Sequence, residues 1–130
     1  MADAMYNLAR QKFLGGELDW DTNTFKARLI DTASYTFDAA HTSVNNLAGI
    51  VHTSAAIASP TKTNGYADCA DITFTAVAGV TVEAMVVYHE DASSASSTLV
   101  VYIDSAAQFP VTPNSGDIIA VINASGLFRI

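Results

Sequence analysis

Cysteine is almost absent from this sequence. The 130 residues contain one, Cys69, so no disulfide forms within the chain and no disulfide framework points to a compartment. Asp68 and Asp71 lie close to it on either side, and nearby carboxylates disfavour the thiolate that a reactive cysteine needs. Cys69 is therefore predicted to be a small, unreactive, packed side chain.

Basic residues are also scarce. Six Lys and Arg stand against thirteen Asp and Glu, which gives a formal net charge of -7. The basic residues are scattered from Arg10 to Arg129, whereas binding to the phosphates of a nucleic acid needs a concentrated basic surface. Nucleic acid is therefore not expected as a partner, and the acidic surface mainly favours solubility.

Long apolar runs are missing as well. No uninterrupted run approaches the roughly 20 residues that cross a bilayer. Residues 1–16, MADAMYNLARQKFLGG, lack the long apolar core of a secretory signal. The sequence therefore predicts a soluble protein made in the cytoplasm, without a membrane partner. The sequon that begins at Asn123 is interpreted as a chance match.

Motifs for catalysis are a further absence. The sequence has no G-x-S-x-G elbow, no G-x-x-x-x-G-K phosphate loop, no dinucleotide fingerprint and no H-E-x-x-H pair. We therefore expect no enzymatic activity, no cofactor and no metal. The alternative is a metal-assisted hydrolase that uses His89, Glu90 and Asp91 as nitrogen and oxygen ligands, and a solvated strand end is the simpler interpretation.

Apolar residues make up half of the chain, and they are densest in residues 81–104. Two apolar runs of strand length, joined by a serine-rich connection, predict a β-hairpin there. Both faces of each run are apolar, which is typical of strands that are covered on two sides. In the second run, Leu99, Val101 and Ile103 are predicted to share one face. The chain length suits a single domain over residues 1–130.

The rest of the chain is expected to cover this hairpin. An amphipathic helix is predicted from Asp3, as its cap, to about Leu14, where Gly15-Gly16 ends it. Further strands are predicted at residues 24–31, 55–58, 72–76, 117–123 and 127–130, a short helix capped by Asp38 within residues 37–47, and a turn at Asn64-Gly65. The last strand is a candidate sheet edge. The expected fold is mainly β, an antiparallel β-sandwich of jelly-roll-like or immunoglobulin-like form with an N-terminal α-helix.

The only tryptophan, Trp20, lies in an acidic turn formed by Glu17, Asp19 and Asp21. Two interpretations are open. Trp20 and Leu18 plug one end of the core, or Trp20 and nearby tyrosines form a platform on which sugar rings stack. The first is favoured because Leu18 and Trp20 alternate with the acidic residues.

Three segments also match a known family in the same order along the chain. They are LGGELDWDTNTFKARLIDT (14–32), GVTVEAMVVYHEDASSASSTLVVYIDS (79–105) and FPVTPNSGDI (109–118), and together with the opening helix that precedes them they cover just over half of the sequence. The Leu-Asp-Trp and Pro-Val-Thr-Pro-Asn motifs are the sharpest. In these segments the chain resembles small structural proteins of tailed-bacteriophage virions, although Ser115-Gly116 stands where relatives tend to have Gly-Gly.

This resemblance implies a non-enzymatic particle component, similar to capsid decoration or cement proteins, on the outer surface of a virion and made in the host cytoplasm. The implied partners are the major capsid protein and the chain itself, as a homodimer or homotrimer. Contacts are expected through the exposed side of the N-terminal helix, residues 33–65 and the terminal strand. The candidate interface residues are Met5, Tyr6, Phe13, Trp20, Phe128 and Ile130. The alternative is a tail or fibre module that binds a host-surface glycan.

Overall fold

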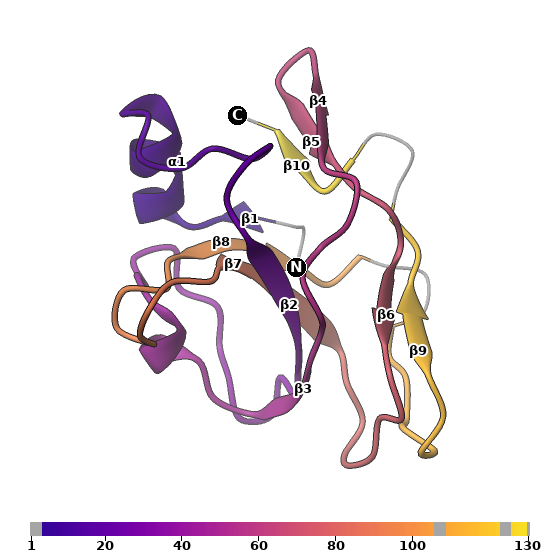
Figure 1. Ribbon diagram of the computed structural model, residues 1–130. Helices are drawn as coiled ribbons and strands as arrows, with labels where there is room; N and C mark the ends of the chain where they lie inside the picture. The colour runs from indigo at the N-terminus through magenta and orange to yellow at the C-terminus, as the bar shows by residue number, and fades with distance from the viewer. Residues whose placement is uncertain (1–3, 106–108, 123–125, 130) are drawn as a thin grey trace.

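A five-stranded antiparallel sheet forms the centre of the computed structural model, which describes residues 4–105, 109–122 and 126–129 (Figure 1). Its strands, in spatial order, are β1 (Ala4–Met5), β8 (Leu99–Ile103), β7 (Ala84–His89), β2 (Phe25–Ile30) and β3 (Ile50–Thr53). The predicted hairpin is confirmed as β7 and β8, and all of β8 is buried. The strand predicted at residues 24–31 is confirmed as β2.

Both faces of this sheet are covered, as the two-sided apolar pattern predicted. Met85 and Val87 belong to a core on one face, whereas Val86 and Tyr88 belong to a core on the other. The predicted face of Leu99 is wrong. Val87 pairs with Val101 and Tyr88 with Leu99, so β8 carries one extra residue, and this bulge moves Leu99 to the face opposite Val101.

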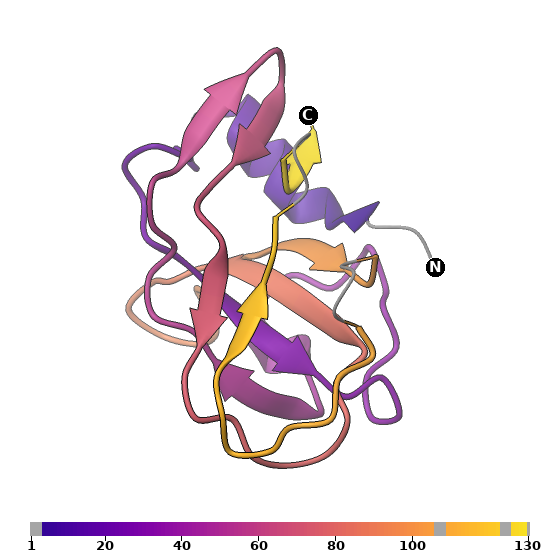
Figure 2. The same cartoon turned by 90° about the vertical axis from the view of Figure 1, so that its right-hand side faces the viewer.

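One face is packed against α1 (Asn7–Leu14) and two small sheets, which we name the layered cover (Figure 2). The first small sheet pairs β6 (Ile72–Phe74) with β9 (Ile118–Ala120), and the second has the order β10 (Phe128–Arg129), β5 (Tyr66–Asp68), β4 (Thr61–Thr63). Their buried side chains, such as Phe74 and Ile118, join the first core. The strands predicted at 72–76, 117–123 and 127–130 are confirmed over these shorter spans, with β10 at a sheet edge.

The opposite face is packed against residues 31–49, which we name the loop cover. The helix predicted within residues 37–47 is wrong. Only a 3-10 turn, η1 (Val44–Asn46), forms there, with Ser43 as its cap in place of Asp38. Short polar side chains hold the backbone in turns instead, because Asp38 accepts a hydrogen bond from the Ala40 amide and Asn46 accepts one from the Thr42 amide.

The N-terminal helix is shorter than predicted, because it begins at Asn7 and Asp3 lies outside the described residues. Ala4 and Met5 form β1 instead, opposite Tyr102 and Val101 of β8. Tyr6 then occupies the cap position, and its side chain makes no capping hydrogen bond to the helix. The predicted stop is confirmed, since Gly15 caps the C-terminus and Gly16 has a positive φ of 77°.

The strand predicted at residues 55–58 is wrong, although the chain still follows the edge of β2. The amides of Ser54 and Ile57 donate to the carbonyls of Ala27 and Phe25 at 2.8 Å. Between them the Ser54 hydroxyl accepts from the Ala27 amide, so a side chain replaces one rung of the ladder. The segment therefore stays beside β2 without regular strand pairing.

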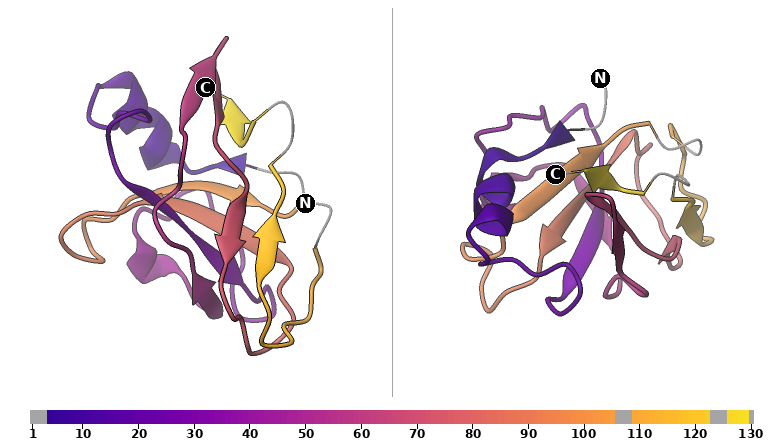
Figure 3. Two further views of the ribbon diagram at one scale, coloured as in Figure 1. Left: turned by 45° about the vertical axis from the view of Figure 1, so that its right-hand side comes forward. Right: turned by 90° about the horizontal axis from the view of Figure 1, so that it is seen from above.

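A hairpin of β4 and β5 projects beyond the body of the molecule and lies near α1 and β10 (Figure 3). Asn64 and Gly65 at its tip have φ values of 52° and 82°, which a two-residue hairpin turn requires, so the predicted turn is confirmed. The protein is thus mainly β, with antiparallel sheets layered in a sandwich-like arrangement and one short N-terminal helix.

Candidate functional site

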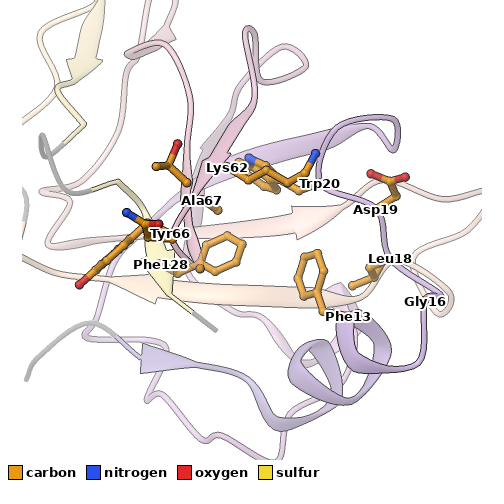
Figure 4. Close-up of a pocket in the computed structure, with 12 residues that line it drawn as sticks. Phe13, Gly16, Leu18, Asp19, Trp20, Lys62, Tyr66, Ala67 and Phe128 are labelled. Atoms are coloured by element: carbon orange, nitrogen blue, oxygen red, sulfur yellow. The ribbon is translucent and has the colours of Figure 1, made fainter.

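A groove of about 500 Å³ opens between the end of α1, the acidic turn and the β4–β5 hairpin (Figure 4). Phe13 enters it from α1, Trp20 from the acidic turn, and Phe128 from β10. Lys62 and Ala67 enter it from the hairpin. Residues far apart in the sequence therefore meet here, because β5 pairs with β10 and the helix ends beside both.

The floor of the groove is aromatic. Ring centroids are 5.7 Å apart for Phe13 and Phe128, 5.2 Å for Trp20 and Phe128, and 4.7 Å for Trp20 and Phe25. These tilted and edge-on contacts are the arrangements that aromatic pairs favour. The indole Nε1 of Trp20 donates to the carbonyl of Asp68 at 3.1 Å, so its polar atom is also satisfied.

Trp20 is therefore mainly a core residue, and only a small part of its side chain is exposed in the groove. Its side chain and that of Leu18 are each 5% exposed, which confirms that the pair plugs one end of the core. Only an edge of the indole remains available to a ligand, and a sugar ring needs an open face for stacking. The platform interpretation of Trp20 does not fit this burial.

The rim of the groove is negative on one side. Glu17, Asp19 and Asp21 are exposed, and they alternate with the buried Leu18 and Trp20. Asp19 holds the turn rigid, because its carboxylate accepts from the Asp21 amide at 2.9 Å. Across the groove the Lys62 ammonium contacts the Asp21 carboxylate, and as an exposed pair it contributes little stability. Of these three carboxylates, that of Asp21 contacts Lys62, and Asp19 lines the groove.

Burial corrects part of the predicted interface. Met5, Tyr6, Trp20 and Phe128 are at most 8% exposed, so these side chains face the interior of the chain and present little surface to a partner. The sequence pattern of an apolar stripe is the same whether the stripe packs on its own sheet or on another protein. In this chain the stripe packs on its own sheet. Phe13 is half-buried in the groove and stays a prediction. Ile130 lies outside the described residues.

The possible metal ligands His89, Glu90 and Asp91 are not brought together. The His89 ring packs 5.6 Å from the Phe25 ring, and this burial lowers its pKa. Glu90 lies 3.9 Å from the Lys26 ammonium, and Asp91 accepts from the Ala92 amide. Within residues 4–105, 109–122 and 126–129, no three His, Cys, Asp or Glu side chains are placed to hold a metal ion.

Cys69 is half-buried beside the first core, and burial together with Asp68 and Asp71 raises its pKa to about 12. The thiol therefore stays protonated near neutral pH, which agrees with its predicted lack of reactivity.

The hairpin side of the groove has no strand pattern in the sequence. Asn64-Gly65 was predicted as a turn, but the flanking TKT and YAD segments have too few apolar residues to predict strands. The available signal was the asparagine-glycine pair itself, which is typical of a two-residue hairpin whatever its flanks.

The groove and fold together define a β-rich scaffold with an apolar groove beside an acidic turn. The chain matches no protein-family model and no curated protein. None of its helices in the described part of the chain is both long and apolar enough to span a membrane.

Proposed function

We propose that this protein is a non-enzymatic structural component of a tailed-phage virion, a cement protein that stabilises the head by bridging major capsid subunits. The resemblance of residues 14–32, 79–105 and 109–118 supports the family. The observation that carries the mechanism is a rigid two-sided core whose exposed aliphatic side chains and open sheet edges lie on separate elements.

The exposed aliphatic residues occur at different places on the molecule. Leu14 at the end of α1 is 81% exposed, whereas Ile119 in β9 and Val121 just after it are 49% and 54% exposed. Ile119 and Val121 are two residues apart, so they share the outer face of the β6–β9 ribbon. Single exposed apolar residues are common, but two on one strand face are a small contact patch.

Open sheet edges add a second kind of contact. In the described part of the chain, β3 and β1 are the edges of the central sheet, and β4 and β10 are the edges of the three-stranded sheet. Edge strands can accept a strand from another protein, and charged residues usually prevent this. β3 has the sequence IVHT, without Lys, Arg, Asp or Glu, and its Ile50 is 41% exposed.

Several modest contacts on one rigid body suit a clamp. Stable protein interfaces bury on the order of 1,600 Å² in total, and linked contacts bind far more tightly than each alone. A cement protein that touches two or more capsid subunits would resist their separation in this way. The acidic surface, with its net charge of -7, limits self-aggregation at high copy number.

The copy number in purified virions tests this proposal. Quantitative mass spectrometry is expected to give a number comparable to that of the major capsid protein, and imaging of a labelled chain is expected to place it over the head. Ile119→Asp should lower the number of copies bound to capsids, whereas Ser94→Asp, in the exposed serine loop, adds the same charge and should not. A few copies confined to the tail would contradict the cement proposal.

A second candidate function is a tail or fibre module that binds a host-surface glycan. The observation that favours it is the groove itself, where Tyr66, 38% exposed, presents the aromatic ring that the buried Trp20 does not. Titration with host-surface oligosaccharides, followed by the emission of this single tryptophan, tests the candidate directly. Saturable binding together with label at the tail tip would favour the glycan module over cement.

A further inference from the structure

The groove has an exposed apolar side chain at its own rim. Leu14 is 81% exposed, the highest value among the large exposed hydrophobic residues of the described chain. Its neighbours Phe13 and Gly16 line the groove, so Leu14 lies within a few residues of the opening. An apolar knob and an apolar groove are therefore placed side by side on one surface.

The charges beside the knob and beside the groove are opposite. Arg10 lies four residues before Leu14, so the two share one face of α1, and both are exposed. The acidic turn contributes Asp19 to the groove lining and has Glu17 and Asp21 next to it, while Lys62 of the groove contacts Asp21. The knob is thus apolar and basic, whereas the groove is apolar and acidic.

A knob and a groove that lie close together on one surface satisfy the requirement of a two-fold contact. In such a contact the same patch is used twice, so that the knob of each copy meets the groove of the other. We propose that two copies of this protein associate in this way, each placing Leu14 in the groove of its partner with Arg10 against the partner's acidic turn.

The chain between knob and groove permits the close approach that this contact needs. Gly15 and Gly16 separate Leu14 from the acidic turn and carry no side chains. A Cβ on Gly16 would meet no other atom within 4 Å, so the surface around this glycine is open. Two such surfaces can cross over each other near the two-fold axis without steric conflict.

Sedimentation velocity of the purified full-length chain over a wide concentration range tests this proposal. The wild-type chain is expected to show a monomer–dimer equilibrium that high salt weakens. Leu14→Gln keeps helix propensity and, at 81% exposure, leaves the core intact, yet it is expected to raise the dimer dissociation constant about tenfold or more. Val121→Gln is the matched control, because it makes the same kind of change at a 54% exposed site on another surface.

Trp20 supplies a second readout. It is the only tryptophan and it lines the groove, so its emission should change on dilution of the wild-type chain as the partner's Leu14 leaves. The Leu14→Gln variant should show the dissociated emission at concentrations where the wild-type chain is dimeric.

A charge exchange tests the orientation of the two copies. Arg10→Glu should weaken the dimer, and adding Glu17→Arg to the same chain should restore much of the loss. A monomer at all concentrations, a trimer, an equal loss in Leu14→Gln and Val121→Gln, or no rescue by the charge exchange would each overturn the proposal. These measurements use no capsid, so they can fail while the cement proposal stands, and the reverse also holds.

Discussion

The two covers of the central sheet achieve the same burial by different means. The layered cover consists of a helix and paired strands, and it places Phe74, Ile118 and Leu127 against the sheet mainly through apolar contact, with a hydrogen bond from Lys12 of α1 to Thr98. The loop cover has no element longer than the η1 turn within the described residues, and it uses hydroxyl groups as well as apolar area. Regular elements satisfy their own backbone, whereas an irregular cover must find a partner for each polar group separately.

A chain of hydrogen bonds fixes the loop cover to the sheet. The hydroxyls of Tyr6 and Tyr35 are 2.8 Å apart, and the Tyr35 hydroxyl is 2.9 Å from Nδ1 of His41. Tyr6 is fully buried, and its burial raises the pKa of the phenol, so it stays protonated and needs an acceptor. The loop cover therefore depends on a few specific contacts, and the layered cover depends on area.

The same substitution in both covers should separate these two modes of stabilisation. Phe74 is fully buried in the layered cover, and Phe74→Ala is expected to lower the free energy of unfolding by about 3–5 kcal/mol. Phe37 in the loop cover is half-buried, with ring contacts to Tyr6 and Tyr102 near 5 Å, so Phe37→Ala should cost clearly less. Urea denaturation of both variants provides the measurement. Equal losses would mean that apolar area matters as much in the loop cover.

Removal of one hydroxyl group should destabilise the loop cover more than the small size of that group suggests. Tyr35→Phe leaves the Tyr6 hydroxyl buried without its acceptor, and this should cost about 1–3 kcal/mol. Amide hydrogen exchange should become faster mainly in residues 31–49, and the exchange rates in the layered cover should not change.

The matched control removes both hydroxyls. The Tyr6→Phe and Tyr35→Phe double variant should cost less than the sum of the two single changes, because neither hydroxyl is then left unsatisfied. Additive losses would show that the two tyrosines act independently and that area alone holds the loop cover.

The same contrast explains which elements could be predicted from the sequence. The strands β2 and β6 follow from local alternation of apolar residues, and β7 and β8 follow from continuous apolar runs that are buried on both faces. The start of α1 could not be predicted, since Met5 pairs with Val101 at the far end of the chain. The loop cover was not predictable either, because the contact between Tyr6 and Tyr35 joins residues 29 positions apart and leaves no local pattern in the sequence.

Only one side of the groove could be predicted from the sequence, for a related reason. Trp20 and the acidic turn are recognisable locally, and the burial of Leu18 and Trp20 confirms their role as a core plug. The hairpin wall is polar along its length, and β5 gains its position by pairing with β10 about 60 residues later, Ala67 with Phe128. A site that depends on such a pairing leaves no local pattern in the sequence.

The smallest expected effect concerns a histidine on the layered side of the sheet. His89 packs against Phe25 at one edge of the aromatic floor, and burial lowers its pKa from the ordinary value near 6.5, although Asp91 and Glu90 oppose this. A lowered pKa means that the unfolded chain takes up the proton first as the pH falls. His89 therefore contributes its full stability above about pH 6.5, and this contribution decreases as the solution becomes more acidic. His89→Gln should remove that part of the pH dependence, which urea denaturation of both chains at about pH 7 and pH 5 would measure as a smaller difference for the variant. If the difference in unfolding free energy between the two pH values is the same in both chains, the imidazole is as easily protonated in the folded chain as in the unfolded one. Protonation of His89 then does not weaken the layered cover at this edge.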